Sequence, residues 1–277
     1  MIVSSRFLLQ TAKEKHFAIP SANFVDQISA NAHVSVAEEL GLPLILSFAQ
    51  VHSTYQSLEE AALLGKYYAQ KANVPVVLHL DHGENIDFIK KAIELGFTSV
   101  MIDASDKSLE DNIRITKEVV DYAHAYDVFV EAEIGHVGTG VSVDSLQEAK
   151  SIYTSVVEAV ELTEKTNLDS LAISIGTSHG SYKGTPVINF NRLEELSKAL
   201  AVPLVLHGGS SSGDNNLEKC ALNGIAKINI YTDFILEAYK NLQGHEAKDY
   251  FLVKKLLSEG MKNILRRYYK VFHTQKI

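Results

Sequence analysis

VPVVLHLDHG, residues Val74 to Gly83, is an apolar run of strand-forming residues that ends abruptly in an aspartate and a histidine. Two similar runs follow, SLAISIGTSHG at Ser170 to Gly180 and VPLVLHGGS at Val202 to Ser210, and each also places a histidine at or just beyond its end. The three histidines are His82, His179 and His207. One histidine at a strand end is most often structural, but three protein ligands with an open fourth position are typical of a catalytic zinc site. The repeated pattern therefore predicts a metal centre.

Strand-like apolar runs alternate with amphipathic helical stretches along nearly the whole chain. The expected strands are Phe17–Asn23, Pro43–Ala49, Val74–Asp81, Ser99–Ala104, Val128–Gly135, Ser170–Gly176, Pro203–Gly209 and Ala226–Thr232. Eight such units predict a parallel (β/α)8 TIM barrel, with an extra N-terminal helix around Phe7 and further C-terminal helices. No Gly-x-Gly-x-x-Gly motif follows the first strand, which counts against a dinucleotide-binding open sheet.

Composition narrows the class of protein. The chain has 277 residues, 46% of them hydrophobic and 22% charged, which suits one barrel domain spanning residues 1–277. The net charge of −8 argues against a nucleic-acid partner, and the absence of a long apolar run argues against a membrane span. The single cysteine, Cys220, is expected in a helix core and fits a cytoplasmic protein. The basic stretch KNILRRYYK near the C-terminus is interpreted as a solvated helix face, with a local anion site as the alternative.

Catalytic residues of such barrels lie at the carboxyl ends of the strands. The polar residues expected there are Asn23, Gln50, Asp81, His82, Asp103, Glu131, Glu133, His179, His207, Asn229 and Thr232. A carboxylate beside a metal ligand can orient that ligand or transfer a proton to a bound substrate, so Asp81 is the leading candidate for chemistry. Asn23 and Asp103 taken alone fit a cap or a turn equally well.

A phosphate site is expected next to the metal. Gly208 and Gly209 follow the seventh strand and lead into Ser210, Ser211 and Ser212, which offer backbone amides and hydroxyl donors to an anion. Phosphate commonly sits between the loops after strands seven and eight in these barrels. Lys183, in the loop after the sixth strand, adds a cation.

These residues resemble the zinc-dependent class II ketose-bisphosphate aldolases, the family of the fructose- and tagatose-bisphosphate aldolases, over essentially the whole chain. The resemblance is carried by HLDHG at 79–83, SVMIDAS at 99–105, VEAEIG at 130–135, AISIGTSHGSYKG at 172–184, PLVLHGGSS at 203–211 and AKINIYTD at 226–233.

The resemblance implies a role for each matching position. Zinc would be held by His82, His179 and His207, and Asp81 would be the acid and base for the C4 hydroxyl. Glu133 and Asp103 would hold a second metal position. Dihydroxyacetone phosphate would be bound by Gly180, Lys183, Gly208, Ser210, Asn229 and Thr232, with a sodium or potassium ion beside its phosphate. The partner would be a phosphosugar substrate, and the assembly a homodimer or homotetramer.

Four departures from the family cluster at the aldehyde end of the site. The loop GHVGTGVSVDSLQEAK lacks the usual acidic pair, which leaves Asp144, Glu148 and His136 as candidates for exchanging the C3 proton. Tyr231 occupies the position associated with C4 stereochemistry, Ala49 replaces a common serine, and GHEAKDYF lacks the expected arginine for a distal phosphate. We therefore expect the substrate to keep the dihydroxyacetone phosphate part and to differ in its aldehyde part.

Two other functions fit the same residues. A metal-dependent sugar-phosphate epimerase or hydrolase could use the same histidines, and a non-catalytic subunit of an aldolase complex would tolerate the altered loop. The retention of Asp81 together with three histidines favours the aldolase. Lys183 could in principle form a Schiff base, but its place in a glycine-rich loop beside a metal ligand counts against that chemistry.

Overall fold

A closed barrel of eight parallel strands forms the centre of the molecule. The computed structural model describes residues 1–135, 153–178, 180 and 184–277. Each strand pairs with the next in chain order and the eighth pairs with the first. The strands are β1 (Ile19–Asn23), β2 (Leu44–Ala49), β3 (Val76–Gly83), β4 (Ser99–Ile102), β5 (Phe129–Ile134), β6 (Ser170–Ile173), β7 (Leu204–Leu206) and β8 (Ile225–Ile230). The predicted (β/α)8 barrel is confirmed.

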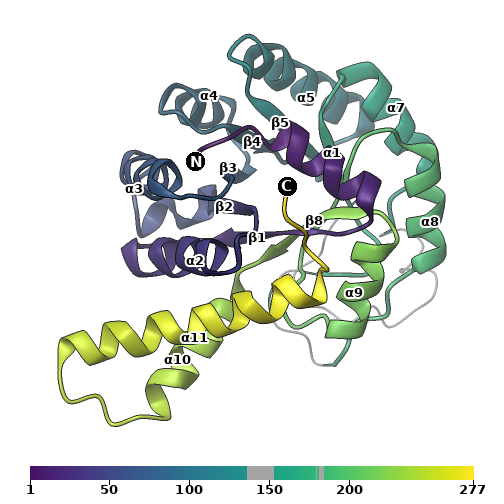
Figure 1. Cartoon of the computed structure of the whole chain (residues 1–277). Helices are drawn as coiled ribbons and strands as arrows, with labels where there is room; N and C mark the ends of the chain where they lie inside the picture. Colours follow the sequence, from purple (N-terminus) through teal and green to yellow (C-terminus); the bar gives the residue numbers. More distant parts are fainter. Residues whose placement is uncertain (136–152, 179, 181–183) are drawn as a thin grey trace.

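Helices cover the outside of the barrel (Figure 1). Those that follow the strands are α2 (Gln27–Leu40), α3 (Leu58–Lys71), α4 (Ile86–Glu94), α5 (Leu109–His124), α7 (Val156–Thr166), α8 (Phe190–Ala199), α9 (Asp214–Leu222) and α10 (Thr232–Gln243). Side chains mark several of their starts, for example Ser57 and Asp26, each of which caps its helix through a reciprocal capping box. Cys220 is buried in α9, as the sequence predicted.

The strands are almost entirely buried because helices cover one face and the barrel interior covers the other. Most of them are shorter than the apolar runs suggested, since pairing stops where the chain turns into the loops. Asp103 and His207 thus lie just beyond β4 and β7. The prediction that Thr232 ends the eighth strand was wrong, because Thr232 begins α10.

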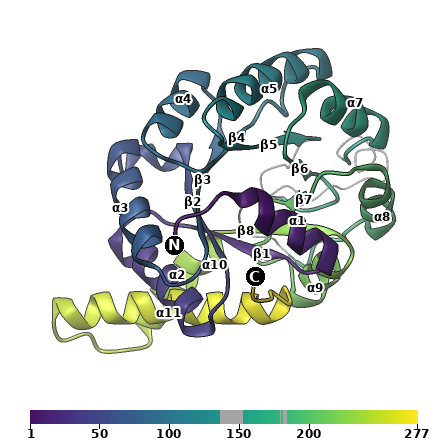
Figure 2. The ribbon, with the colours of Figure 1, turned by 45° about the horizontal axis from the view of Figure 1, so that its top comes forward.

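The helix α1 (Ser5–Lys15) lies across the amino-terminal end of the barrel (Figure 2). Its residues Leu8, Leu9 and Ala12 pack on side chains from the start of the strands, including Ile19 and Val77. Burying this apolar face closes one mouth of the barrel. The carboxyl ends of the strands, where catalytic groups are expected, lie at the other mouth.

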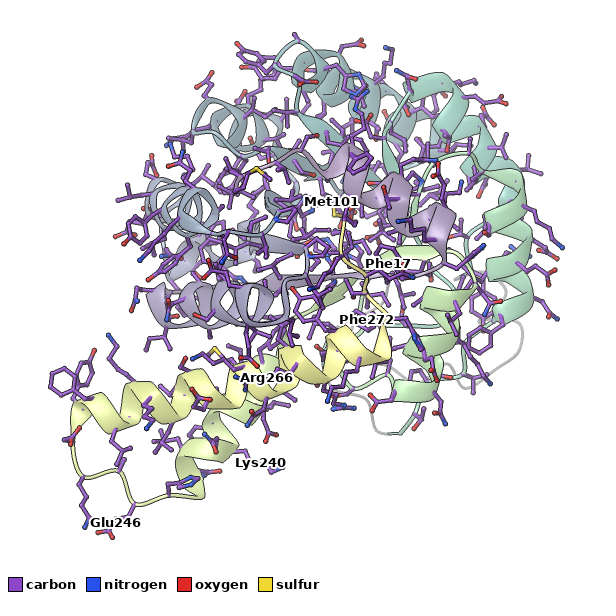
Figure 3. The ribbon with its side chains drawn as sticks, viewed as in Figure 1. Phe17, Met101, Lys240, Glu246, Arg266 and Phe272 are labelled. Atoms are coloured by element: carbon purple, nitrogen blue, oxygen red, sulfur yellow. The ribbon has the colours of Figure 1, made fainter. Side chains whose placement is uncertain are left out.

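The helices α10 and α11 (Tyr250–Val271) form an antiparallel pair that projects beyond the barrel (Figure 1). Glu246 lies near the tip of this arm, far from Phe17 and Met101 in the barrel (Figure 3).

The stretch KNILRRYYK lies on α11, and its interpretation as a solvated face holds only for the charged residues. Its residues Ile264, Leu265, Tyr268 and Tyr269 are buried, because residues four apart share one side of a helix.

No helix within the described ranges combines the length and the apolar character that crossing a bilayer requires.

Candidate active site

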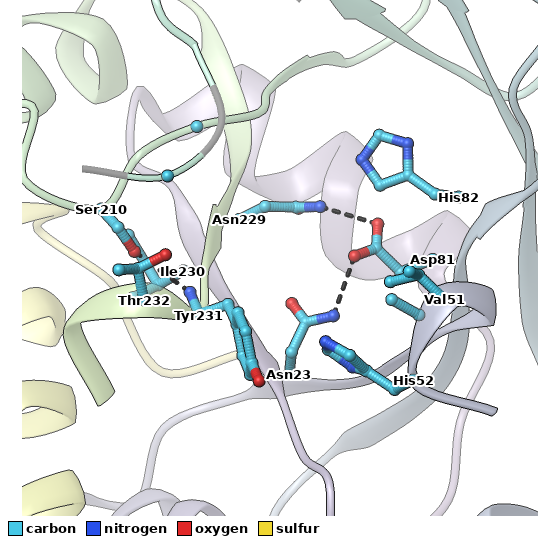
Figure 4. A pocket seen from close by; sticks show the side chains of 13 residues that line it. Asn23, Val51, His52, Asp81, His82, Ser210, Asn229, Ile230, Tyr231 and Thr232 are labelled. Atoms are coloured by element: carbon cyan, nitrogen blue, oxygen red, sulfur yellow. Dashed lines mark hydrogen bonds between the residues drawn. The ribbon is translucent and has the colours of Figure 1, made fainter. Parts of the chain in front are cut away.

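A pocket with a cavity volume of about 150 Å³ opens at the carboxyl ends of β1, β2, β3 and β8, which is room for a small organic molecule (Figure 4). Its lining includes nine of the residues predicted from the sequence: Asn23, Asp81, His82, Gly180, Gly208, Ser210, Asn229, Tyr231 and Thr232. The barrel therefore brings together residues that are up to about two hundred positions apart in the chain.

Asp81 is buried and held from two sides by amide groups. The Nδ2 atom of Asn23 donates to Oδ2 at 2.8 Å, and Nδ2 of Asn229 donates to Oδ1 at 2.8 Å. Burial alone would raise the pKa of Asp81, but positive charge on His82, His207 and Lys227 lowers it well below its ordinary range. The side chain is thus a fixed carboxylate with its remaining lone pairs available to a substrate hydroxyl.

The strand β3 is irregular where it carries this aspartate. Its pairing with β4 shifts register between Leu80 and Gly83, and His82 adopts a left-handed backbone with φ of 46°. Consecutive residues of a regular strand face opposite sides, so this distortion is what allows Asp81 and His82 to line the same pocket. A left-handed non-glycine residue is strained, and such strain is concentrated at functional sites.

The rings of His82 and His207 point nitrogen atoms at each other. Nε2 of His82 lies 2.8 Å from Nδ1 of His207, and the rings meet edge to face at 89°. The other nitrogen of each ring contacts a carboxylate: His82 Nδ1 is 2.8 Å from Asp103, and His207 Nε2 is 2.9 Å from Glu131. The facing nitrogens are at hydrogen-bond distance in this structure. Carboxylates behind both rings orient them as they orient metal-binding histidines, so the same two nitrogens could serve together as metal ligands.

The surrounding charge also favours a cation. Burial alone would lower the pKa of His82, but Asp81, Asp103 and Glu133 raise it to about 9. Glu133 Oε2 lies 3.8 Å from Nδ1 of His207, so a further carboxylate approaches the same point. His82 forms one group of possible metal ligands with Asp81 and His207 and a second with Asp103 and Glu133. These donors fit a metal such as zinc, which binds imidazole and carboxylate ligands.

A buried ionic network lies beneath His207. Nζ of Lys227 donates to both oxygens of Glu131 at 2.9 and 2.8 Å, and it lies 3.3 Å from Nε2 of His79. Burial opposes ionisation of Glu131, but the Lys227 ammonium lowers its pKa to about 2. Glu131 therefore stays ionised and fixes the ring of His207. The sequence predicted Glu131 near a strand end but did not predict this role. Lys227 was missed, because a lysine inside a strand reads as solvent-facing and is rarely fully buried.

Backbone conformation and close packing explain the glycines in the loop after β7. Gly208 has φ of 66°, and a Cβ atom on it would lie 2.3 Å from the carbonyl oxygen of Ser178. The Ser210 Oγ atom accepts from the backbone nitrogen atoms of Tyr231 and Asp233, and within the described ranges its own hydrogen has no acceptor and could reach a ligand. Thr232 adds the N-terminal end of α10, where backbone amides favour anions. Gly209 is not part of the pocket lining; a Cβ there would contact Ile228 and Asn229.

Some predicted residues lie elsewhere or outside the described ranges. Asp103, Glu133 and His207 are not among the residues that line the pocket; Asp103 contacts His82, and Glu133 approaches His207. His179, Lys183, His136, Asp144 and Glu148 lie outside the described residues.

The sequence did not single out His52 and Val51, which line the pocket from the short 3-10 helix η1 (Gln50–Thr54) after β2. Their only signal was their position directly after a strand end.

Comparisons with known proteins agree with this geometry. A family model described as "Fructose-bisphosphate aldolase class-II" matches residues 3–276. The crystal structure of the YdjI aldolase from Escherichia coli K12 is 33% identical, with a TM-score of 0.89 over 99% of this chain and 98% of that one. A putative fructose-1,6-bisphosphate aldolase from Coccidioides immitis is 27% identical, with a TM-score of 0.86 over 98% and 96%. The fructose-bisphosphate aldolase of Campylobacter jejuni, at 23% identity and a TM-score of 0.82 over 99% and 96%, shares the fold.

Proposed function

Because the chain belongs to the class II fructose-bisphosphate aldolase family and is therefore a carbon–carbon lyase, we propose that it cleaves a ketose phosphate to dihydroxyacetone phosphate and an aldehyde. The observation that carries the proposal is Asp81, a carboxylate clamped by Asn23 and Asn229 beside the facing imidazoles of His82 and His207. A general base next to a cation site is what retro-aldol cleavage of a hydroxy ketone needs.

The residues of the chain divide the work between binding and proton transfer. Gly208, Ser210 and Thr232 are proposed to hold the phosphate through backbone amides and hydroxyls. In cleavage, Asp81 takes the proton from the C4 hydroxyl while the C3–C4 bond breaks; in condensation, it returns that proton to the aldehyde oxygen. Asn23 and Asn229 keep the carboxylate oriented in both directions.

The proposed metal is zinc, held by His82 and His207 with His179 as the third ligand that the family resemblance implies. When bound, the ion supplies Lewis-acid stabilisation of the negative charge that cleavage leaves on the ketone fragment. Glu131 and Asp103 orient the two histidine rings from behind. The sodium or potassium ion expected beside the phosphate stays a prediction, as does a single domain over residues 1–277.

A metal-removal experiment tests this assignment. Exhaustive chelation is expected to abolish aldol cleavage, and added zinc or cobalt to restore it. Metal content and turnover should be followed in the same samples. Turnover that survives complete removal of the metal would refute the proposed chemistry.

The function itself is tested by a product assay. Purified protein is offered a panel of ketose 1-phosphates and ketose 1,6-bisphosphates, and released dihydroxyacetone phosphate is detected with a coupled dehydrogenase. Neither an epimerase nor a simple hydrolase releases this product. We expect turnover with one member of the panel and weak turnover of fructose and tagatose 1,6-bisphosphates; kcat/KM near or above about 10⁴ M⁻¹s⁻¹ for either would show that the aldehyde part is the usual one.

A further inference from the structure

The ring of His52 lines the pocket, and neither of its nitrogen atoms forms a hydrogen bond with the part of the chain that the structure describes. The side chain is 7% exposed, and among the described residues its buried Nδ1 atom has no hydrogen-bond partner. Other buried histidines make at least one hydrogen bond through the ring: His79 pairs with Ser99 at 2.8 Å, and His33, whose Nδ1 atom also lacks a partner, contacts the carbonyl oxygen of Asn23 through Nε2 at 3.2 Å. Buried polar groups in folded proteins are nearly always paired, so a histidine without such a partner beside a cavity points to a ligand.

The position of His52 is set by its neighbours. The helix η1 turns the chain immediately after β2, and the imidazole packs on the ring of Tyr231 with centroids 4.5 Å apart and on the edge of Phe48 at 6.4 Å. Figure 4 shows the ring directed into the pocket, toward Asn23 and Tyr231. The orientation is therefore held by packing, while the hydrogen-bonding capacity of the ring is left for the contents of the pocket.

His52 and Asp81 line the same pocket. Asp81 is close enough to influence His52 electrostatically, and Asp81 lies between His82 and His52 in the view of Figure 4. Burial lowers the pKa of His52, so the ring is neutral and offers one donor and one acceptor. A substrate whose C4 oxygen is at Asp81 and whose ketone end is at the imidazole pair would extend its remaining carbons toward His52.

We infer that His52 is a specificity-determining residue, which hydrogen-bonds the hydroxyl on the carbon next to the aldehyde carbon and so selects α-hydroxyaldehydes. The inference rests on the proposed aldolase function and deepens it by assigning a residue to the recognition of the aldehyde hydroxyl. Tyr231 packs against the ring of His52 and lines the same pocket. A site built to pair a hydroxyl discriminates against an analogue that lacks it, because the polar group of the protein is then left unpaired.

Two aldehydes that differ only in this hydroxyl test the inference. Lactaldehyde and propanal are each condensed with dihydroxyacetone phosphate, and kcat/KM for the aldehyde is measured for the wild type and for His52→Phe, which keeps an aromatic ring against Tyr231. The expected result is that the lactaldehyde-to-propanal ratio of kcat/KM falls about 10-fold or more in His52→Phe and is partly restored in His52→Gln. Ser53→Ala, an exposed position on the same turn, should leave the ratio unchanged. An equal loss for both aldehydes in His52→Phe would overturn the inference.

A second measurement separates this result from failure of the proposed function. Exchange of the carbon-bound hydrogen of dihydroxyacetone phosphate with deuterium oxide, followed by NMR, reports the ketone half of the reaction without any aldehyde. Exchange by the wild type together with an unchanged aldehyde ratio in both His52 variants contradicts the role of His52 alone. Absence of both exchange and condensation in metal-loaded wild-type protein contradicts the aldolase assignment. Exchange retained in His52→Phe shows in addition that the variant is folded.

Discussion

Asp81 combines a fixed position with a low pKa, and both come from its neighbours. Its substitution by alanine should remove the proton-transfer group without removing an imidazole ligand, so turnover in aldol cleavage is expected to fall about 10²- to 10⁴-fold. Zinc content, measured by elemental analysis, should fall far less. Asp87→Ala, at an exposed position on α4, is the matched control and should retain wild-type turnover. Parallel losses of metal and turnover in Asp81→Ala would instead make Asp81 a structural support of the metal centre.

The buried pair of Glu131 and Lys227 makes a prediction about stability as well as metal binding. Glu131→Gln leaves the Lys227 ammonium without its counter-charge in the barrel interior, so the free energy of unfolding is expected to fall by about 3–5 kcal/mol. It also removes the carboxylate that fixes His207, which should weaken zinc binding about 10- to 100-fold.

Urea unfolding and zinc titration measure these two effects of the Glu131 substitution. The control is Glu161→Gln, which breaks an exposed ion pair with Lys165 and should cost about 0.5 kcal/mol or less. In the double variant with Lys227→Met, stability should recover in part while zinc affinity does not, since the two residues are coupled. A Glu131→Gln protein with wild-type zinc affinity would show that Glu131 does not position His207.

At the level of single residues, the sequence predicted the candidate catalytic and ligand residues better than the residues that hold them in place. Asp81, His82 and Asn229 were found because polar residues directly after apolar runs are unusual and barrel topology gathers them at one mouth. His52 was missed because its role depends on a turn that brings its ring against Tyr231, a contact that no local pattern encodes. The polar contacts between Lys227, Glu131 and His79 likewise depend on the interior of a closed barrel, which only the three-dimensional arrangement reveals.

At the level of elements, the eight strands were predictable because buried parallel strands are continuous apolar runs separated by amphipathic helices. Their ends were not, since β6 and β7 stop short where the chain leaves for the loops. The interpretation of the basic stretch on α11 as a solvated face was only partly right. It rested on the charged residues and overlooked the helical spacing of the apolar ones. Arg266 and Arg267 do face outward, where they pair with Glu39 and Asp214.

The helix α1 allows a test of whether the two ends of the barrel are independent. Leu9 is 1% exposed in the cluster that closes the amino-terminal mouth, whereas Phe7 on the same helix is 69% exposed. Leu9→Ala is expected to lower the free energy of unfolding by about 2–5 kcal/mol, and Phe7→Ala to change it by less than about 0.5 kcal/mol. Because the site lies at the opposite mouth, kcat of folded Leu9→Ala protein should stay at the wild-type value. A loss of kcat at a temperature where circular dichroism shows the native fold would mean that the packing of α1 also affects the geometry of the active site.

At the level of the whole molecule, the arm of α10 and α11 carries large apolar side chains that the monomer leaves exposed. Tyr250 and Phe251 are 69% and 80% exposed at the start of α11, and Leu236 and Tyr239 are 52% and 58% exposed on α10. Several large exposed apolar side chains on one projecting element are typical of an interface between subunits. This arm is therefore the proposed contact of the homodimer or homotetramer.

The last prediction follows from where these side chains lie. Light scattering should give the wild type a mass of two or four chains, and Phe251→Glu should shift the protein toward the monomer, because a charge buried without a partner opposes association. The fold of the monomer should be kept, since the side chain is exposed before association. The control is Val157→Glu, at a position that is 76% exposed on α7. The helix α7 lies across the barrel from the arm in Figure 1, so this change should leave the mass unchanged. Dissociation by Val157→Glu with no effect of Phe251→Glu would place the interface on the barrel, and a wild-type monomer at all concentrations would remove the oligomer altogether.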